Sequence, residues 1–251
     1  MNTKEKFTGK ADTYAKFRPD YPAAYLDYLT SACGLGRGSH VADIGAGTGI
    51  LSSQLLERGF TVYAVEPNAD MRAQAEARMS ADPSYISVAA SAEATGLAAA
   101  SVDLVTAAQA FHWFDKPRFR AECQRILGPG ACVSLVWNSR DLNSSFIQES
   151  LEICRRLCPG FVGFSGGIQE DQSDFYSFYQ DGKFEFRQFP HPLTYDLQGF
   201  LGRSLSSSYA PGPDGENYRP FVEQLTELFY AYSKDGLLQM PNLTNSYLGR
   251  V

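Results

Sequence analysis

The feature that most constrains the fold is a regular alternation of short apolar runs and helical patterns between residues 39 and 137. The apolar runs have the length and composition of buried strands. They lie at His40 to Ile44, Thr61 to Val65, Tyr85 to Ala89, Val102 to Ala107 and Ala131 to Trp137. Between them, helical patterns lie at Ile50 to Arg58, Ala69 to Met79 and Pro117 to Leu127. Such alternation predicts a doubly wound α/β fold, a mostly parallel sheet with helices on both faces.

The segments on either side of this core extend the same architecture. Helices are predicted at Ala23 to Ala32, Ser144 to Leu157, Leu197 to Ser206 and Tyr218 to Ser233, and a loop at Gly160 to Gly167. Two later strands, Lys183 to Phe189 and Leu237 to Leu248, bring the expected sheet to seven strands. With 251 residues the chain suits one continuous domain. We expect an arm and helix over residues 1–38, a ligand-binding core over 39–141, and the last strands with an inserted helical cap over 142–251.

Composition narrows the classes of partner. Lys and Arg number 22 against 28 acidic residues, giving a net charge of -6. A nucleic-acid partner would require a basic surface, so a small-molecule ligand is favoured. The polar segment Met1 to Lys10 and the lack of a long apolar run predict no membrane segment, no export and a cytoplasmic location. The five cysteines are scattered without a CxxC pair and histidine partners, which predicts reduced thiols and no metal.

The segment between the first strand and the first helix is rich in glycine. It reads Asp43-Ile44-Gly45-Ala46-Gly47-Thr48-Gly49 and leaves little side chain above the turn. Ligands of open parallel sheets bind beyond the carboxyl ends of the strands, so this turn is a candidate ligand-binding loop. A tight strand-to-helix turn also needs glycine for steric reasons alone. Taken by itself, the turn leaves both interpretations open.

Two carboxylates indicate which ligand the turn would take. Glu66 ends the second strand, where a carboxylate can accept hydrogen bonds from ribose hydroxyls. Asp43 would repel a pyrophosphate and suits a cationic ligand. The dinucleotide fingerprint also places its third glycine three residues after the second, whereas Gly49 follows Gly47 by two. The pattern favours an adenosyl ligand without phosphates, with an NAD-dependent oxidoreductase as the alternative.

These motifs, together with Ser91-Ala92-Glu93 and the run Gln109-Ala110-Phe111-His112-Trp113-Phe114, resemble class I S-adenosylmethionine-dependent methyltransferases. The resemblance covers Thr8 to Trp137 and implies a Rossmann-like fold with S-adenosyl-L-methionine as cofactor. The nearest group is the ubiquinone-biosynthesis and trans-aconitate methyltransferase-like set, with its methyltransferase type 11 domain.

The resemblance also implies a set of cofactor-binding residues. Asp43, Gly45, Ala46 and Gly47 would line the methionine and ribose parts, and Glu66 would accept both ribose hydroxyls. Pro67 would pack on the ring edge. The remaining contacts are expected from Ser91, Ala92 and Glu93 at the adenine, from Gln109 and Ala110 at the methionine end, and from Tyr14 and Arg18 of the N-terminal arm over the methionine tail.

Methyl transfer is an in-line displacement that chiefly requires alignment and exclusion of water. The expected acceptor is a small molecule. His112 is the candidate general base, although a histidine flanked by Phe111 and Trp113 can equally be a packing residue. A protein that binds the cofactor without catalysis is a further alternative.

Overall fold

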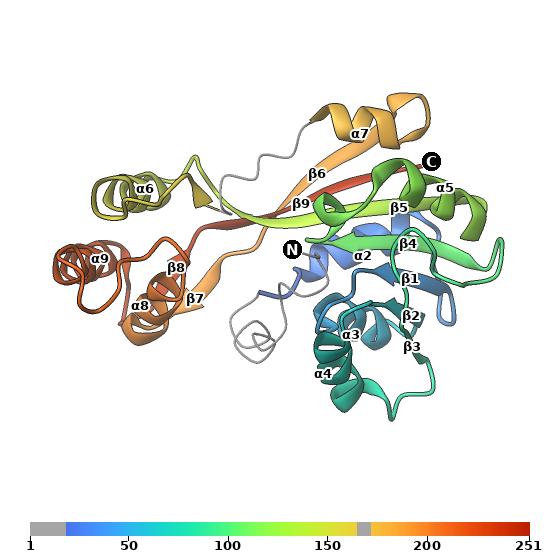
Figure 1. The fold of residues 1–251 in the computed structure, drawn as a ribbon, viewed down its shortest axis with the longest axis horizontal. Helices are drawn as coiled ribbons and strands as arrows, with labels where there is room; N and C mark the ends of the chain where they lie inside the picture. The colour runs from blue at the N-terminus through green and yellow to red at the C-terminus, as the bar shows by residue number, and fades with distance from the viewer. Residues whose placement is uncertain (1–18, 165–171) are drawn as a thin grey trace. The chain divides into compact units, whose positions relative to one another are not determined.

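The structure is a computed structural model that describes residues 19–164 and 172–251 (Figure 1). Its helices are α2 (Ala23–Ala32), α3 (Ile50–Glu57), α4 (Ala69–Met79), α5 (Lys116–Ile126), α6 (Ser145–Leu157), α7 (Gln172–Phe178), α8 (Leu197–Leu205) and α9 (Tyr218–Tyr232). Short 3-10 helices are η2 (Phe111–Trp113) and η4 (Gln180–Gly182). The strands are β1 (His40–Ile44), β2 (Thr61–Val65), β3 (Tyr85–Val88), β4 (Val102–Ala108), β5 (Leu127–Arg140), β6 (Phe184–Pro190), β7 (Leu193–Tyr195), β8 (Leu238–Met240) and β9 (Asn242–Gly249).

Seven strands form one sheet in the order β3-β2-β1-β4-β5-β9-β6 (Figure 1). The pairings β1 with β2, β1 with β4, β2 with β3 and β4 with β5 are all parallel. Because the chain fills one side of β1 with β2 and β3 and then returns to place β4 on its other side, the strand order reverses between β1 and β4. Ligands of doubly wound sheets bind at such a reversal. The predicted fold class is confirmed, and the candidate turn after β1 lies at the reversal.

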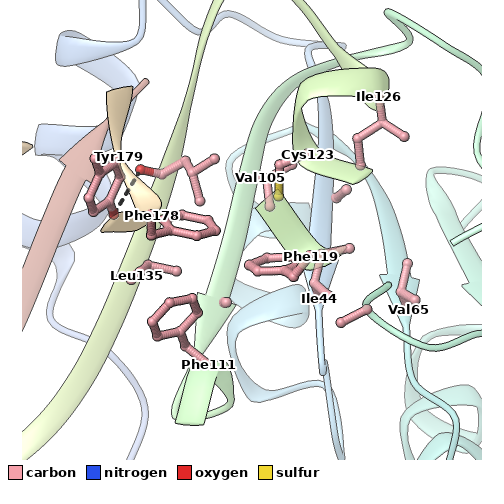
Figure 2. Packing of buried hydrophobic residues seen from close by; sticks show 14 of the residues in the cluster. Ile44, Val65, Val105, Phe111, Phe119, Cys123, Ile126, Leu135, Phe178 and Tyr179 are labelled. Carbon is pink, nitrogen blue, oxygen red and sulfur yellow. Dashed lines mark hydrogen bonds between the residues drawn. The ribbon is translucent and has the colours of Figure 1, made fainter. Parts of the chain in front are cut away.

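Helices pack on both faces of this sheet, as expected for a doubly wound fold. On one face, Tyr25 and Leu29 of α2 and Leu55 of α3 share a buried cluster with Val62 and Leu104 of the strands. On the other face, α5 and α7 cover the strands (Figure 2). The second cluster includes Val105, Phe111, Phe119, Cys123, Ile126, Leu135 and Phe178, all nearly inaccessible to solvent. Alternate strand residues point to opposite faces, so the near-continuous apolar runs of the sequence supply both clusters.

The described chain divides into two compact units. Unit 1 comprises residues 19–137, 172–189 and 244–251, and unit 2 comprises residues 138–164 and 190–243. Unit 2 contains α6, α8, α9 and a two-stranded antiparallel sheet of β7 and β8. Its own apolar cluster includes Phe146, Phe200, Phe221 and Phe229. Across the described residues, none of the helices has the length and apolar character needed to cross a membrane.

Several expected elements differ from the structure. The strand predicted over Leu237 to Leu248 is wrong, because it is two strands: β8 pairs with β7, and β9 belongs to the large sheet. Pro241 separates them, and proline interrupts a strand because it has no N–H to donate. Strand β5 begins at Leu127 rather than Ala131, and its pairing with β4 shifts register between Val102 and Leu104, where the Gly-Pro-Gly segment is accommodated. Helix α7 and strand β7 were not predicted.

Candidate functional site

A cavity of about 290 Å³ opens at the carboxyl ends of β1, β2 and β4 in unit 1. The structure brings eleven of the fourteen predicted site residues into its lining: Asp43, Gly45, Ala46, Gly47, Glu66, Pro67, Ser91, Ala92, Glu93, Gln109 and Ala110. These residues come from four separate segments of the sequence. Their convergence follows from the parallel sheet, which places the ends of successive strands at one edge.

The three glycines of the turn serve different purposes. A Cβ added to Gly49 would lie 2.3 Å from Met79 Cε and 3.1 Å from Ala75 Cβ, so this glycine lets α3 approach α4. A Cβ added to Gly47 would meet only Met71 Sδ, at 3.8 Å. Gly47 faces the cavity, and its backbone N–H donates to Glu66 Oε2 at 2.9 Å. A Cβ added to Gly45 would lie 2.7 Å from Ala110 Cβ, and Gly45 also lines the cavity. The steric explanation therefore applies to Gly45 and Gly49, and the ligand-binding explanation to Gly45 and Gly47.

Glu66 is fixed by the backbone around it. Its Oε2 accepts from Gly47 N, and its Oε1 accepts from Asn68 N at 2.8 Å. The side chain is 8% exposed, and burial raises its pKa, opposed by these two backbone hydrogen bonds and by the charge of Arg72. A carboxylate has about four lone-pair sites, so two remain for a ligand. Glu66 is thus a pre-positioned acceptor for a pair of hydroxyl groups.

Asp43 lies beneath the turn at the end of β1. Its Oδ2 accepts from Ser52 Oγ at 2.6 Å and its Oδ1 from Thr106 Oγ1 at 2.9 Å. Burial raises the pKa of Asp43 to about 6, against the lowering effect of the two hydroxyls, and the charge of Glu66 raises it further. With both oxygens engaged by hydroxyls, Asp43 can act on a ligand through its charge.

The turn after β4 carries backbone strain at the cavity. Gln109 has a φ of 57°, in the left-handed region that non-glycine residues rarely adopt. Its N–H donates to Val136 O of the neighbouring strand at 2.9 Å, which holds the conformation in place. Such strain costs on the order of 1 kcal/mol and gathers at functional sites. The strained residue redirects the chain from β4 into η2.

Sequence reasoning missed several lining residues: Pro19, Tyr21, Thr48, Ile50, Leu51, Asn68, Met71, Ala108, Trp113 and Phe114. Thr48 is 2% exposed, and its Oγ1 has no hydrogen-bond partner among the described residues. The position of Thr48 within the glycine turn was the sequence feature that could have identified it as a lining residue. Asn68 caps α4, accepting from Met71 N at 3.0 Å. Trp113 and Phe114 belong to the run after β4 that carries the methyltransferase resemblance, and that run was the available signal for them.

Three predicted residues are not part of the described lining. Tyr14 and Arg18 fall outside the described residues. His112 follows β4, as expected, and lies in η2, with its ring centroid 4.7 Å from that of Trp113. The described lining of the cavity includes Ala110 and Trp113 but not His112. Its role as a base stays a prediction.

The charge of the cavity bears on which ligand fits. Three carboxylates, Asp43, Glu66 and Glu93, contribute to the described lining, and none of the described lining residues is Lys or Arg. Such a surface disfavours phosphates and favours a cation. The orphaned hydroxyl of Thr48 and the two spare acceptor sites of Glu66 add a donor and acceptors for a polar ligand. The described residues fit an adenosyl cofactor with a positive sulfonium.

Fold and cavity together define a class: a doubly wound sheet with an adenosyl-type site at its strand reversal. The comparisons with known proteins agree. A methyltransferase domain family matches residues 42–135. An uncharacterised methyltransferase of Mycobacterium tuberculosis is 38% identical over 150 residues, 60% of this chain and 59% of the relative. The chain thus spans 59% of the length of that curated relative.

Solved structures show the same fold over nearly the whole chain. A putative type II methyltransferase from Anaeromyxobacter dehalogenans is 29% identical with a TM-score of 0.61, covering 93% of this chain and 98% of the other. The Haemonchus contortus phosphoethanolamine N-methyltransferase 2, solved with S-adenosyl-L-methionine, has a TM-score of 0.54 at 15% identity, covering 100% of this chain and 59% of the other. These similarities support a class I S-adenosylmethionine-dependent methyltransferase, with the methyltransferase domain matched over residues 42–135. The finer ubiquinone-biosynthesis and trans-aconitate grouping stays a prediction.

Proposed function

We propose that the protein transfers a methyl group from S-adenosyl-L-methionine to a small-molecule acceptor. The observation that carries the proposal is the cavity at the strand reversal, with a glycine turn, three carboxylates and no basic side chain in its described lining. Bound there, the cofactor would supply an electrophilic methyl group on a positive sulfonium. The matching methyltransferase domain supports the same conclusion.

Each part of the cavity has a role in this proposal. Glu66 accepts the ribose hydroxyls with the lone pairs that Gly47 and Asn68 leave free. Asp43 favours the positive charge of the ligand through space. Ser91, Ala92, Glu93 and Pro67 form the adenine end, and Gln109 and Ala110 form the methionine end together with the Thr48 hydroxyl. The enzyme's own contribution is then to align the reactants and exclude water.

The acceptor would enter beside the aromatic residues of the lining. Trp113 is 39% exposed, and Trp113, Phe114 and Tyr21 give the cavity lining apolar surface. An apolar wall with a few polar groups is typical of sites for small organic molecules. His112, next to Trp113 in η2, is our candidate base where the acceptor carries a neutral hydroxyl or amine. An acceptor that is already ionised would need no base.

Calorimetry with two ligands tests the cofactor. We expect S-adenosyl-L-methionine to bind and NAD to show no heat of binding. Glu66→Ala removes hydrogen bonds between a carboxylate and two hydroxyls, which should weaken binding by roughly 10- to 100-fold. Glu57→Ala removes an exposed carboxylate at the end of α3 and serves as the control. Unchanged affinity in Glu66→Ala, or tight binding of NAD, would overturn the assignment.

Turnover is tested separately with radiolabelled cofactor and a panel of phenols, amines and carboxylic acids. Transfer of label to any member supports an enzyme. His112→Ala then shows whether a base is used. If His112 is the base, the variant should transfer label more slowly at neutral pH, and high pH, which ionises the acceptor, should restore the rate. Tight cofactor binding without label transfer across the panel would instead favour the non-catalytic alternative.

A further inference from the structure

The large sheet of unit 1 ends in an exposed strand. β6 is last in the strand order, so among the described strands only β9 pairs with it (Figure 1). The residues of β6 from Glu185 to Gln188 are all exposed. At the opposite edge, β3 is shorter and none of its residues is exposed. An edge strand presents unpaired N–H and C=O groups that can pair with another chain, and β6 is the more accessible of the two edges.

Two hydrogen bonds define how β6 pairs with β9. His191 N–H, just beyond the end of β6, donates to Asn242 O at 2.8 Å. Gln188 Nε2 donates to Asn245 Oδ1 at 3.0 Å. Moving back along β6 from His191 to Gln188 moves forward along β9 from Asn242 to Asn245 by the same number of residues. Both bonds therefore belong to one antiparallel register.

This register decides which backbone groups of β6 face the open edge. In an antiparallel pair, positions that exchange backbone hydrogen bonds alternate with positions whose N–H and C=O point away from the neighbouring strand. His191 is a hydrogen-bonded position, and Phe186 lies an odd number of residues from it. Phe186 is opposite Tyr247, and their ring centroids are 4.9 Å apart. The residues whose backbone groups face the open edge are thus Phe184, Phe186 and Gln188.

The side chains of β6 are available on both faces of the strand. Arg187 and Glu185 are 53% and 49% exposed, and Arg187 Nε lies 2.6 Å from Glu185 Oε1. The Arg187 guanidinium lies 4.4 Å from the centroid of the Tyr28 ring. On the other face, Phe186 is 46% exposed, and Tyr176 of the neighbouring α7 is 57% exposed. The edge therefore combines an exposed ion pair with exposed aromatic rings.

The order of these side chains is complementary to a second copy of itself. In an antiparallel pair of two β6 strands about a two-fold axis at Phe186, Glu185 of each copy lies opposite Arg187 of the other. An axis at Glu185 or at Arg187 would instead place like charges opposite each other, which is destabilising. Charges on an edge strand ordinarily oppose pairing. Here the alternation of sign removes that barrier for a copy of the same strand in the Phe186 register.

We propose that β6 is a self-association surface through which two copies of this chain form a symmetric dimer. The two strands run antiparallel, and Phe186 N–H of each copy donates to Phe186 O of the other. Phe184 and Gln188 exchange the flanking hydrogen bonds, so the two large sheets become one. A contact of this kind uses the same surface on both copies and closes at two chains. β9 and β5 separate β6 from β4, so the contact leaves the cavity lining accessible.

Sedimentation equilibrium of the full chain tests the proposal. We expect dimers at micromolar concentrations and weaker association at high salt, because salt screens exposed ion pairs. Arg187→Glu places two glutamates opposite each other on both sides of the axis and should weaken association about 10- to 100-fold. Arg219→Glu in α9 is the matched control, because it reverses an exposed arginine that pairs with Glu223 at 2.9 Å. A monomer at every concentration, or equal association of Arg187→Glu and the unaltered protein, would overturn the proposal.

A mixing experiment tests the register itself. Glu185→Arg alone should also associate weakly, because it places two arginines opposite each other. In an equal mixture of Arg187→Glu and Glu185→Arg, each acidic strand lies opposite a basic one, so heterodimers should form. Circular dichroism checks that both variants keep the fold, as expected for substitutions at exposed positions. Folded variants that stay monomeric when mixed would contradict pairing about Phe186.

Discussion

Unit 1 and unit 2 bury different kinds of side chain. In unit 1, buried polar groups gather where β1, β2 and β4 end: Asp43, Thr48, Ser52, Glu66, Asn68 and Thr106. In unit 2, the buried polar residues of the described chain are Ser150 and Asn242, and the remainder of its core is apolar. Burying a polar group costs free energy unless it is hydrogen-bonded. Apart from the Thr48 hydroxyl, unit 1 meets this requirement with hydrogen bonds among hydroxyls, carboxylates and backbone groups, and so it keeps charged side chains buried at the cavity.

This difference indicates which residues determine the stability of the fold and which determine ligand binding. Unit 2 is held by aromatic and aliphatic packing between helices, as between Phe200 and Phe229, whose ring centroids lie 6.0 Å apart. Unit 1 has apolar clusters of its own, but at the cavity it places two carboxylates near each other and a residue in a strained conformation. We therefore expect substitutions in the core of unit 2 to change stability and those at the cavity to change ligand binding.

The largest expected effect is on stability, from Phe221→Ala in α9. Phe221 is 0% exposed, so the truncation leaves a cavity in the unit 2 core and should lower the free energy of unfolding by about 3–5 kcal/mol. Tyr230→Ala on the same helix removes a ring that is 65% exposed and should cost much less. Chemical denaturation measures both. If affinity for S-adenosyl-L-methionine also falls sharply in folded Phe221→Ala, the separation of roles between the units is lost.

The next effect belongs to the turn of unit 1. Gly49→Ala combines a φ of 76° with a Cβ 2.3 Å from Met79 Cε, and should destabilise the protein by about 2–4 kcal/mol. Gly34→Ala has a φ of 64° but no atom near the new Cβ, so it should cost only about 1 kcal/mol. Thermal unfolding of the two variants distinguishes crowding from backbone strain. Equal losses in both would show that close packing of α3 on α4 matters little.

A third prediction uses the pKa of Asp43, which burial raises to about 6. A cationic ligand favours the ionised carboxyl, so below this pKa part of the binding free energy goes into removing the proton. Affinity for S-adenosyl-L-methionine should be level above pH 7 and weaken about tenfold by pH 5. Asp43→Asn should bind more weakly at pH 7 and lose this dependence. Titration calorimetry across the pH range measures this dependence. If the affinity of Asp43→Asn falls between pH 7 and pH 5 in the same way, the effect belongs to another group.

The sequence predicted the elements of unit 1 well because their signals are local. Runs such as His40–Ile44 and Thr61–Val65 are bounded by turn residues and are long enough to be strands. The cavity residues were predictable for the same reason, since the turn and Glu66 follow strand ends whose meeting is dictated by a parallel sheet. The charge of Asp43 was also readable, but its hydrogen bonds with Ser52 and Thr106 depend on tertiary contacts.

What sequence reasoning missed depends on contacts between distant segments. Phe175 and Phe178 fall within residues 142–251, where a helical cap was expected, and they pack in the sheet core of unit 1 with Phe111. Apolar periodicity shows that a helix has a buried face but does not say which partner covers it. The division of the last predicted strand at Pro241 is likewise set by pairing, because each half joins a different sheet.

The smallest expected effect has the opposite sign and lies in unit 2. Gly202 is an interior residue of α8, its φ is not in the left-handed region, and a Cβ there would have no atom within 4 Å. Glycine in a helix interior is less favourable than alanine, so Gly202→Ala should stabilise the protein by about 0.5–1 kcal/mol. Denaturant titration of both variants would measure their free energies of unfolding. We expect the same Gly-to-Ala substitution to raise that free energy at Gly202 in unit 2 and to lower it at Gly49 in unit 1. A loss of stability in Gly202→Ala would mean that α8 needs close approach at this position, as the unit 1 turn does at Gly49.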